Sequence, residues 1–501
     1  MPALSTITRF YGAAQVAALD RRVIDEFGIP GFDLMHRAAD AGFQALCGRW
    51  PEADRLAVVC GPGNNGGDGF LIAARGLASA MTVRVWFPGN PERLTGDAHR
   101  AYQAFMRAGG VLTDSSAEAL ADADVAVDAL LGTGLGRPLA GDFLAAVQAI
   151  NRAGEQGAGV LAVDIPSGLD ADTGAIWGEA VRADVTATFI GAKLGLVTGA
   201  GPAHAGEVTL HELEAPDRAY ADMPWLASQP DDTWLAAALP RRRRDAHKGD
   251  HGHVLCVGGN TGMGGAARLA AEAALRVGAG LVSVATRGGQ AAAMTQARPE
   301  LMCRDMTAAA DLDALLDRAT VVAIGPGLGT DNWARDLLER VLMSDRPLVV
   351  DADALNVIAE NRPPARDNWI ITPHPGEAGR LLGCATADVQ ADRPAAAAAL
   401  AERYSAMAVL KGAGTLIADR RGELWVSTAG NPGMAVGGMG DLLTGTIAGL
   451  LAQGIDPATA AVAGVCLHGR AADRAAADGE RGLLPSDCLA PLRALANPAS
   501  S

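Results

Sequence analysis

The sequence predicts an α/β protein in which two parallel-sheet domains follow one another along the chain. In each half, short β-type runs alternate with helical stretches, as expected for βαβ units. Nearly every glycine-rich cluster directly follows a β-type run, which is where open α/β sheets bind their ligands. The chain has 501 residues, 49% of them hydrophobic and only 4% aromatic, a composition that suits two cores of tightly packed α/β layers.

The first half opens with about fifty residues whose apolar positions follow a helical spacing. We then expect a strand at 58–60, a glycine-rich loop over 61–69 and a helix over 70–78. Further strands are predicted at 83–87, 125–128, 160–164, 185–190 and 208–211. The proline-containing stretch 214–240 is predicted to connect the two domains.

The second half repeats this alternation. A strand at 253–257 leads into the glycine-rich loop 258–265 and a helix that runs through Arg276. Further strands are predicted at 281–285, 321–324, 348–351, 370–372 and 409–411, followed by a hairpin of 415–418 with 424–427. A long apolar helix is predicted over 442–451.

Charge and cysteine content restrict the classes of function. The formal net charge of −15 argues against a nucleic-acid partner, because neutralising phosphates requires a basic surface. The basic run 241–244 is either a solvated linker face or a contact for an anionic ligand. The seven cysteines form no CxxC pair, so buried free thiols are expected. Without an apolar signal core or a bilayer-length apolar run, we expect a cytoplasmic protein with no membrane partner.

The first glycine-rich motif, GPGNNGGDG at 61–69, follows a strand and opens a helix. Exposed amides at a helix N-terminus attract phosphate, so a nucleotide phosphate is a reasonable ligand. The acidic residue that usually binds the ribose is missing, because the next strand ends in Pro88, Gly89 and Asn90. An oxidoreductase is therefore the weakest interpretation. A purely structural turn would not need two asparagines and an aspartate.

Two further clusters lie at predicted strand ends in the same half. One is DALLGTGLGRP, from Asp128 to Pro138, and the other is DIPSGLD, from Asp164 to Asp170. An aspartate at a strand end can reach a ligand, while glycines let the backbone approach it closely. Each cluster alone could be a capped turn, but three in one domain favour a ligand site.

Together, GPGNNGGDG, DALLGTGLGRP and DIPSGLDADTG resemble the NAD(P)H-hydrate epimerase domain over residues 1–215. The resemblance implies a Rossmann-like parallel-sheet domain that binds a hydrated reduced dinucleotide. It assigns this substrate to Asn64, Asn65, Gly66, Gly67, Asp68, Gly132, Thr133, Gly134, Leu135, Gly136, Arg137, Pro138 and Asp164. It also implies a potassium ion held by Asn65, Asp128 and Ser167, and neutral and single carboxylate oxygens suit such a cation.

Epimerisation inverts the carbon that carries the added hydroxyl group on the reduced nicotinamide. The reaction requires a group that assists the departure and return of water, or the opening of the ring. Asp164 is the catalytic candidate for this role. Lys193, in the segment GAKLG, is a second candidate, although a solvated surface lysine is an equally good interpretation.

Asp441 is the strongest catalytic candidate in the second half. It follows Gly438 and Gly440 at the start of the long apolar helix. The helix N-terminus offers free amides to a developing anion, and the carboxylate can take a proton from a hydroxyl group. An N-capping aspartate is the alternative, but the glycine-rich segments upstream form a wider loop than a cap requires.

This helix start resembles the ribokinase-like superfamily, in which an aspartate activates a hydroxyl group for phosphoryl transfer. With HKGDHG, GGN, GPGLG, DADAL, TPHPGE and KGAGT, it resembles the ADP-dependent NAD(P)H-hydrate dehydratase from about Asp232 to Pro491, and we assign residues 225–496 to this domain. A ribokinase-like α/β domain is thereby implied. By this resemblance Lys411, Gly412, Ala413, Gly414, Thr415 and Gly440 contact ADP or AMP. Ala266, Gly327, His374 and Asp441 contact the hydrated dinucleotide.

The implied chemistry converts hydroxide, a poor leaving group, into phosphate, a good one. Asp441 would deprotonate the ring hydroxyl as it attacks the terminal phosphate of ADP, with Mg²⁺ offsetting the charge. The phosphorylated S form would then eliminate phosphate, giving NAD(P)H and AMP, while the epimerase supplies S from R. The family also suggests a homo-oligomer.

Two other classes of function stay open at this point. A ribokinase-like small-molecule kinase fused to a dinucleotide-binding domain would share Asp441 and the anion-binding helix start. KGAGT together with TPHPGE favours the dehydratase, as a difference of degree. A non-enzymatic nucleotide-sensing module would need the glycine loops but not Asp441.

Overall fold

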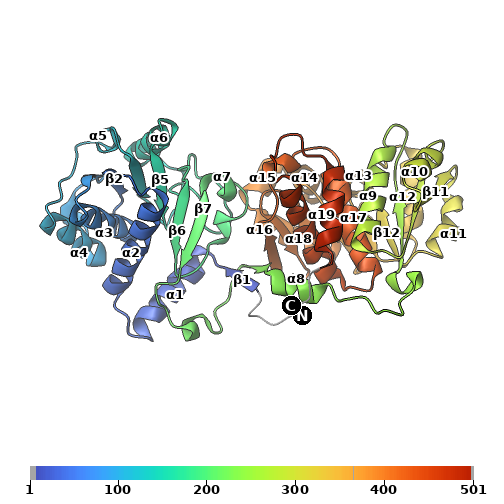
Figure 1. Cartoon of the computed structure of the whole chain (residues 1–501), viewed down its shortest axis with the longest axis horizontal. Coiled ribbons are helices and arrows are strands. Elements are labelled where there is room, and N and C mark those ends of the chain that lie inside the picture. The colour runs from blue at the N-terminus through green and yellow to red at the C-terminus, as the bar shows by residue number, and fades with distance from the viewer. Residues whose placement is uncertain (1–6, 365, 498–501) are drawn as a thin grey trace. The chain divides into compact units, whose positions relative to one another are not determined.

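The structure is a computed structural model, and it describes residues 7–364 and 366–497. The chain divides into two compact units (Figure 1). The smaller unit is Arg9–Ala227, and the larger unit contains the remaining described residues. Bounds of 1–215 and 225–496 for the two activities stay a prediction, and residues 1–6 of the first range lie outside the described residues.

The smaller unit is built around six parallel strands in the order β3-β2-β4-β5-β6-β7. The strands are β2 (Arg55–Cys60), β3 (Thr82–Trp86), β4 (Val125–Ala129), β5 (Gly159–Val163), β6 (Val185–Phe189) and β7 (Glu207–His211). The helices are α1 (Ala13–Asp25), α2 (Gly31–Arg49), α3 (Asn64–Ala78), α4 (Gly96–Arg107), α5 (Ser116–Leu120), α6 (Gly141–Glu155) and α7 (Gly201–His204), with short 3-10 helices η2 (Pro91–Arg93), η3 (Leu194–Leu196) and η4 (Asp217–Tyr220). The strand order reverses beside β2, and such a reversal opens a crevice at the carboxyl ends of the central strands.

Alternation along the strands separates two cores in this unit. Leu56, Val58 and Cys60 of β2 face a cluster that includes residues of α1, α2, α3 and α4. Ala57 and Val59 face the opposite cluster, which includes residues of α5 and α6. Because both faces of the sheet are covered, the strands are continuous apolar runs, and this is why they could be recognised in the sequence.

Helix α3 begins at Asn64, well before the predicted residue 70, so the NNGGD segment is helical rather than a loop. Its glycines allow the helix to start against the strands. An added Cβ at Gly66 would lie 1.8 Å from the carbonyl oxygen of Gly61, and one at Gly69 would lie 2.5 Å from Cβ of Ala129. No side chain fits at such distances in a close-packed core.

The larger unit contains an 11-stranded sheet in the order β1-β8-β17-β16-β15-β14-β13-β12-β9-β10-β11. Its strands are β1 (Ile7–Phe10), β8 (Ala227–Pro230), β9 (His253–Val257), β10 (Leu281–Arg287), β11 (Met302–Met306), β12 (Val321–Ile324), β13 (Leu348–Val350), β14 (Trp369–Ile371), β15 (Met407–Leu410), β16 (Thr415–Ala418) and β17 (Leu424–Ser427). The strands from β15 through β11 in this order are parallel, whereas β16 is antiparallel to both of its neighbours. The order again reverses, this time beside β9.

The helices of this unit are α8 (Asp232–Ala238), α9 (Gly264–Val277), α10 (Ala291–Ala297), α11 (Asp313–Leu316), α12 (Asn332–Leu342), α13 (Ala352–Asn361), α14 (Pro375–Leu382), α15 (Thr386–Ala391), α16 (Arg393–Tyr404), α17 (Met439–Ala452), α18 (Pro457–Ala475) and α19 (Leu489–Leu495), with η5 (Lys248–His251), η6 (Ala309–Leu312), η7 (Pro432–Met434) and η8 (Pro485–Cys488).

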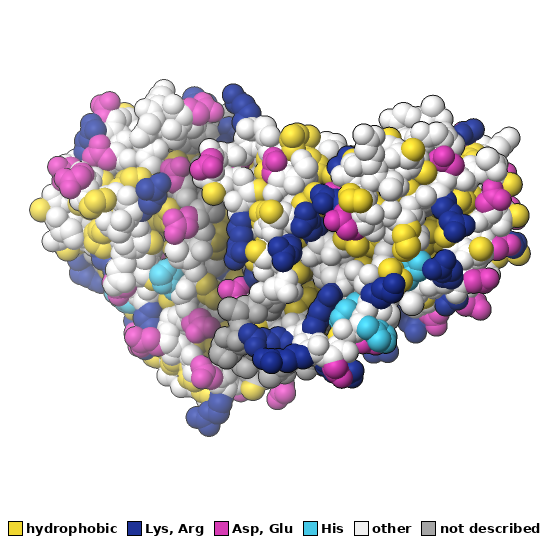
Figure 2. Space-filling model, turned by 45° about the vertical axis from the view of Figure 1, so that its right-hand side comes forward, with side chains coloured by type: hydrophobic (Ala, Val, Ile, Leu, Met, Phe, Trp, Pro, Cys, Tyr) yellow, Lys and Arg dark blue, Asp and Glu magenta, His cyan; other side chains and the backbone are white. Residues whose placement is uncertain are grey.

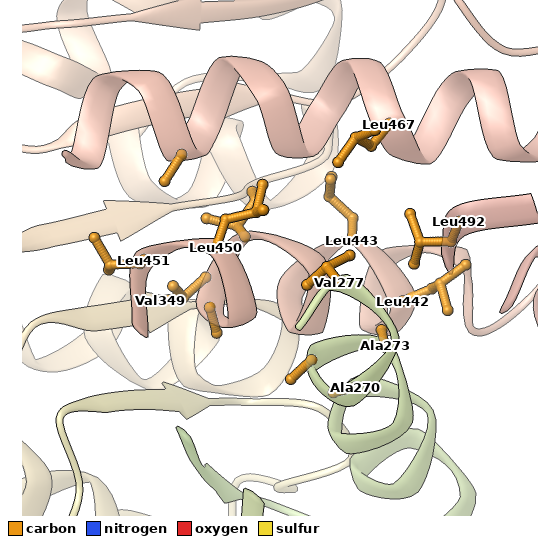
Figure 3. Close-up of a cluster of buried hydrophobic side chains, with 14 of the residues drawn as sticks. Ala270, Ala273, Val277, Val349, Leu442, Leu443, Leu450, Leu451, Leu467 and Leu492 are labelled. Carbon is orange, nitrogen blue, oxygen red and sulfur yellow. The ribbon is translucent and has the colours of Figure 1, made fainter. Parts of the chain in front are cut away.

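Figure 3 shows α17 between α18 and α9, with Leu443 and Leu467 in the same cluster as Ala270. The helices α9 and α17 meet closely because Gly445 leaves room for the backbone of Ala270.

Gly445→Ala is expected to lower the free energy of unfolding of the larger unit by at least about 2 kcal/mol, because overpacking forces packed helices apart. The added Cβ would lie 1.8 Å from the carbonyl oxygen of Ala270. Urea unfolding checks this result. Gly265→Ala, in α9 with nothing within 4 Å of the added Cβ, is the matched control. Equal stability of the two variants would contradict the prediction.

The stretch 214–240, predicted as a connection, contains ordered elements of the larger unit. β8 pairs with β17 through Ser228 and Trp425, and the rings of Trp234 and Trp425 lie 5.5 Å apart. Asp231 caps α8 by accepting a hydrogen bond from the amide of Trp234 at 2.7 Å. The prolines thus mark the ends of short elements. The edge strand β11 was not predicted, because most of its residues are exposed and two, Arg304 and Asp305, are charged.

All seven cysteines are free, as predicted. Their predicted burial holds for Cys60, Cys256, Cys466 and Cys488, and Cys303 is intermediate. It is wrong for Cys47 and Cys384, which are exposed. The apolar neighbours of Cys47 misled the prediction, because this residue lies on the solvent side of α2, and Cys384 lies in the turn after α14.

The surface carries both signs of charge, and Figure 2 shows acidic and basic side chains interspersed over the displayed face. The basic run from Arg241 to Arg244 is exposed. Within it, Arg242 donates to the carbonyl oxygen of Gly278, and Arg243 pairs with Asp245 at 3.0 Å. None of the helices in the described parts of the chain combines the length and apolar character that a membrane span requires.

Candidate active sites

The first candidate site lies where the strand order of the smaller unit reverses. β2 and β4 are parallel neighbours, and Cys60 is aligned with Ala129 at their carboxyl ends. Gly61 approaches the next loop so closely that an added Cβ would lie 1.7 Å from the carbonyl oxygen of Leu130. The glycine is therefore required for the loops after β2 and β4 to meet at this position.

A cavity of about 570 Å³ at this place is lined by most of the predicted residues. The lining residues among them are Asn64, Asn65, Asp68, Gly132, Thr133, Gly134, Leu135 and Asp164. Gly66 and Gly67 are buried within α3. Gly136, Arg137 and Pro138 are exposed and do not line the cavity, so their contact with a substrate stays a prediction.

Gly132 shows how closely the polar groups of this cavity are arranged. An added Cβ at Gly132 would lie 3.5 Å from Cβ of Asn65 and 4.0 Å from Oδ2 of Asp164. The loop after β4 therefore brings the amide of Asn65 and the carboxylate of Asp164 around one glycine. Residues that are far apart in the sequence meet here because β2, β4 and β5 are neighbouring strands.

Asp164 follows β5 directly and has a φ of 68°, a left-handed conformation that aspartate tolerates. Its Oδ1 accepts hydrogen bonds from the amide of Phe189 at 3.2 Å, the hydroxyl of Thr188 at 3.4 Å and Nζ of Lys193. The Lys193 side chain is 0% exposed, and Nζ also donates to Oγ1 of Thr188 and the carbonyl of Phe189 at 3.0 Å each. Lys193 is therefore the buried counter-ion of Asp164 and not a solvated lysine.

Carboxyl groups gather in this cavity. Asp20 from α1 and Asp97 from α4 line it, although neither was predicted to. Burial, followed by the charge of Asp164, raises the pKa of Asp20 to about 6, although Lys193 opposes the shift. Burial, followed by the charges of Asp164 and Asp20, raises the pKa of Asp68 well above its usual range. Burial and the mutual repulsion of these carboxylates therefore favour the protonated forms of Asp20 and Asp68.

Of the three predicted potassium ligands, Asn65 of α3 lines this cavity, whereas Asp128 of β4 and Ser167 after β5 do not. Asp128 is fully buried, and its carboxylate accepts hydrogen bonds from the amide of Ser167 at 2.7 Å and from the hydroxyl of Ser167 at 2.6 Å. Burial raises the pKa of Asp128 to about 6, against the lowering effect of these hydrogen bonds. Both polar atoms of the Asn65 amide are buried without a hydrogen-bond partner among the described residues.

The second candidate site lies where the strand order of the larger unit reverses. β9 and β12 are parallel neighbours, and an added Cβ at Gly258 would lie 2.1 Å from the carbonyl oxygen of Pro326. Gly327 has a φ of 58°, and an added Cβ there would lie 3.1 Å from Cβ of Ala266. Ala266 and Gly327, both predicted to contact the hydrated dinucleotide, are therefore adjacent at the start of α9.

Asp441 lies in the first turn of α17. The helix is capped by Gly438, with a φ of 97°, so Asp441 is not the N-cap. Burial, followed by the charge of Asp351, raises the pKa of Asp441 to about 7, although Lys411 opposes the shift. A carboxyl group with this pKa is suited to take a proton from a hydroxyl group near neutral pH. The capping interpretation is thus excluded.

Lys411 follows β15 and lies at the centre of a charged cluster. Its Nζ is 2.6 Å from Oδ1 of Asp351 and 3.7 Å from Oε2 of Glu377, two carboxylates that are nearly fully buried. Burial alone would lower the pKa of Lys411, but the two carboxylates outweigh burial and raise it. The other oxygen of Asp351 accepts a hydrogen bond from Thr444 of α17 at 2.8 Å. The cluster is thereby tied to the helix that carries Asp441.

Gly440 lies beside this cluster, because an added Cβ there would lie 3.3 Å from Nζ of Lys411 and 3.4 Å from Oδ2 of Asp351. Gly412 has a φ of 143°, and its added Cβ would lie 2.9 Å from a guanidinium nitrogen of Arg393. Gly412 and Ala413 are exposed, and Gly414 and Thr415 are half-buried. The structure therefore brings Lys411 and Gly440 together and leaves the turn after Lys411 at the surface.

His374 caps α14. Its Nδ1 accepts hydrogen bonds from the amides of Gly376 at 3.0 Å and Glu377 at 3.4 Å. The neutral ring therefore carries its proton on Nε2, which lies 3.4 Å from Oε1 of Glu377. The side chain is 51% exposed, so His374 is not part of the hydrophobic core. Its contact with a substrate stays a prediction.

Comparison with known proteins finds matches for both halves. The family model described as NAD(P)H-hydrate dehydratase matches residues 254–492, and the one described as YjeF-related protein N-terminus matches residues 31–195. The chain is 47% identical over 493 residues to the bifunctional NAD(P)H-hydrate repair enzyme Nnr of Coxiella burnetii, covering 98% of this chain and 100% of that protein. The chain belongs to the bifunctional NAD(P)H-hydrate repair enzymes. The Escherichia coli protein of the same name is 43% identical over 489 residues, covering 96% of this chain and 92% of that one.

A solved structure confirms the fold of one half of this repair enzyme. A ribokinase-like superfamily protein from Enterococcus faecalis is 30% identical, with a TM-score of 0.50, and the match covers 54% of this chain and 94% of that chain. The larger unit therefore has the predicted ribokinase-like α/β fold. The all-parallel sheet of the smaller unit agrees with the predicted Rossmann-like domain.

Several site residues of this NAD(P)H-hydrate repair enzyme were not predicted. Asp351 and Glu377 lie within the motifs DADAL and TPHPGE but were given no role. Asp20 and Asp97 belong to no motif. A signal for Asp20 was present, because it lies within the apolar stripe of α1 that buries Val16, Leu19 and Val23. An acidic residue in such a stripe is unusual and indicates a polar cavity.

Proposed function

We propose that the smaller unit interconverts the R and S forms of hydrated NADH and NADPH, and that the larger unit dehydrates the S form. Dehydration consumes ADP and yields NAD(P)H, AMP and phosphate. The observation that carries the proposal is Asp441, which lies in the first turn of α17 without capping it, beside the Lys411–Asp351 ion pair. The full-length similarity to bifunctional repair enzymes supports both activities, an isomerase and a lyase.

In the larger unit, Asp441 removes the proton from the ring hydroxyl, whose oxygen attacks the terminal phosphorus of ADP. The bond from this phosphorus to the bridging oxygen breaks, and AMP leaves. Phosphate then departs from the ring carbon, and a proton leaves the neighbouring carbon, which restores the double bond. Amides at the start of α17 can stabilise the developing negative charge, and Mg²⁺ bound to ADP supplies positive charge. A pKa of about 7 for Asp441 supports its role as the base.

The nucleotide is proposed to lie against Gly440 and the turn that follows β15. Lys411, Gly412, Ala413 and Gly414 form this turn, and Thr415 begins β16. Two carboxylates hold the Lys411 ammonium in position, so it is fixed before a nucleotide arrives. The adjacent Ala266 and Gly327, with His374, are proposed to contact the hydrated ring and its dinucleotide.

In the smaller unit, the hydrated nicotinamide is proposed to enter the cavity of about 570 Å³. Asp164 assists the departure and return of water, and the buried ammonium of Lys193 holds its carboxylate in position. The glycines of the loop after β4, from Gly132 to Gly136, let the backbone approach the dinucleotide.

A potassium ion is proposed at Asn65, Asp128 and Ser167, and the donor set fits it. The amide of Asn65 has no hydrogen-bond partner among the described residues, and the buried carboxylate of Asp128 has no ion-pair partner in that part of the chain. Neutral oxygens with a single carboxylate suit a weakly held monovalent cation. When bound, the ion supplies positive charge beside the loop that carries Gly132.

Asn65→Ala is expected to raise the K⁺ concentration for half-maximal epimerisation at least about tenfold. The substitution removes an amide that hydrogen-bonds to no described residue, so the loss does not arise from a broken internal contact. Epimerisation and the melting temperature are measured against K⁺ at constant ionic strength, with choline as the replacement cation. A variant that keeps the wild-type response of both quantities to K⁺ would argue against the site.

The proposed function is tested by mixing the protein with both hydrate forms, ADP, Mg²⁺ and K⁺, and following the return of dihydronicotinamide absorbance. With ADP present, the absorbance is expected to recover completely. Without ADP, it is expected not to recover. Recovery of only the S portion, beyond slow spontaneous epimerisation, would remove the epimerase assignment. No recovery with ADP or ATP would remove the dehydratase assignment and favour a small-molecule kinase, which shares Asp441. Homo-oligomer formation and a cytoplasmic location stay predictions.

A further inference from the structure

The proposed epimerase reaction requires a proton donor, and neither Asp164 nor Lys193 is suited to supply the proton. For the ring hydroxyl to leave as water, its oxygen must receive a proton. Asp164 is poorly suited, because its Oδ1 already accepts hydrogen bonds from three donors, Lys193, the amide of Phe189 and the hydroxyl of Thr188. The Lys193 side chain is 0% exposed, and its Nζ already donates to three acceptors.

Asp20 is the cavity-lining group that is best placed to supply this proton. It lies on α1 within the stripe of Val16, Leu19 and Val23, which turns into the core, and it lines the same cavity as Asp164. In the described parts of the chain, no hydrogen bond or ion pair holds its carboxyl group. The titratable groups that act on it are Asp164 after β5, Lys193 before η3, Asp68 on α3 and Tyr220 on η4.

The other carboxyl groups of the cavity are less suitable donors. Asp97 has a counter-ion in direct contact, because Arg100 lies 2.9 Å from its carboxylate. Asp68 is only 9% exposed, whereas Asp20 is partly open to the cavity. Asp20 therefore combines access to the substrate with freedom from a counter-ion in direct contact.

We propose that Asp20 is a catalytic general acid of the epimerase site, an assignment that rests on the proposed function of the smaller unit. Its proton passes to the ring hydroxyl, the C–O bond breaks with its electron pair going to oxygen, and water leaves. The lone pair of the ring nitrogen forms a C=N bond to the same carbon. Water then adds to the opposite face, the C=N pair returns to nitrogen, and Asp164 accepts the released proton. Exchange with solvent returns Asp20 and Asp164 to their starting states.

This assignment fixes the direction of a pH dependence. Burial, followed by the charge of Asp164, raises the pKa of Asp20 to about 6, with Lys193 opposing. The carboxyl group is protonated below this pH and loses its proton above it. Because the protonated form is the active one, kcat/KM for epimerisation is expected to fall as the pH rises through about 6.

The test uses the full-length protein with one purified hydrate form, K⁺ and no nucleotide, so that the dehydratase does not consume the substrate. The other form is quantified by chromatography between about pH 5.5 and 8. Asp20→Asn is expected to lower kcat at least about 100-fold and to abolish the decline through pH 6. Asp20→Glu keeps the decline. Asp25→Asn, an exposed position on the same helix, behaves as wild type. ADP-dependent dehydration of the S form stays unchanged in Asp20→Asn, which shows that the chain is folded.

The outcomes distinguish a failure of the proposed epimerase function from a failure of the role assigned to Asp20. No exchange by the wild-type protein would overturn the proposed epimerase function itself. Exchange by the wild type, with the rate or the pH decline retained in Asp20→Asn, would overturn only the assignment of Asp20. Loss of the decline in Asp68→Asn and its retention in Asp20→Asn would also overturn it and would identify Asp68 as the acid.

Discussion

Replacing Asp441 with asparagine is expected to lower the rate of ADP-dependent dehydration at least about 1,000-fold while epimerisation stays at the wild-type rate. Asparagine keeps the size of the side chain but cannot accept the hydroxyl proton. Because Gly438 and not Asp441 caps α17, the substitution does not remove a helix cap. Asp478→Asn, an exposed position in the larger unit, is the matched control.

The pH profile gives this variant a second readout. The base must be ionised, and burial with the charge of Asp351 raises the pKa of Asp441 to about 7. Dehydration by the wild type is therefore expected to rise as the pH rises through about 7, and the residual rate of Asp441→Asn is expected to lack this rise. A variant that retains the rate, or retains the rise, would show that another group is the base.

Lys411→Met is expected to abolish detectable dehydration and to destabilise the larger unit by about 3–5 kcal/mol, because it leaves a buried charge without a partner. The Asp351 carboxylate, whose side chain is 1% exposed, would lose its contact at 2.6 Å. Urea unfolding at pH 7 measures the loss. Lys248→Met, an exposed position, is the control and should keep wild-type stability.

A second variant keeps this prediction testable if Lys411→Met fails to fold. The double variant Asp351→Asn/Lys411→Met removes both charges and is expected to regain most of the stability but not the activity. In the single variant Lys411→Met, which keeps the Asp351 charge, the loss of the lysine raises the pKa of Asp441, so any residual dehydration by this variant should reach its maximum at a higher pH than in the wild type. Stability equal to wild type in Lys411→Met would show that the ion pair contributes little.

The strands and their order along the chain were predictable because both faces of each sheet are buried. Continuous apolar runs such as β9, His253–Val257, marked the central strands, and glycine clusters after them marked the ligand edge. Elements at or next to the sheet edges, such as β11 and β8, have exposed or polar residues and gave no such pattern. The start of α3 was missed because glycines that permit close helix packing look like loop glycines in a sequence.

The chemistry of the two sites was only partly predictable, because ion pairs depend on which strands become neighbours. Lys411 was assigned to the nucleotide, but its pairing with Asp351 follows from the order β15-β14-β13 in the sheet. The rarity of lysine in the sequence is a compositional signal for both sites. The chain has only three lysines among 42 basic residues, and two of them, Lys193 and Lys411, pair with carboxylates in the two candidate sites. In a chain whose basic residues are nearly all arginines, a lysine indicates a site that requires a compact ammonium group in place of a planar guanidinium group.

The placement of β1 gives the chain an unusual connectivity. The polypeptide enters the larger sheet at Ile7, leaves it after Phe10, and re-enters it at Ala227 in β8, the neighbour of β1. The smaller unit is therefore an insertion into an edge of the other fold, with two crossings of the backbone instead of one. A fragment that starts at Ala227 lacks the edge strand β1, whereas a chain in which a short linker joins Phe10 to Ala227 lacks the insertion but keeps both β1 and β8. Insertions at closely spaced ends are a common way for a domain to acquire a second one.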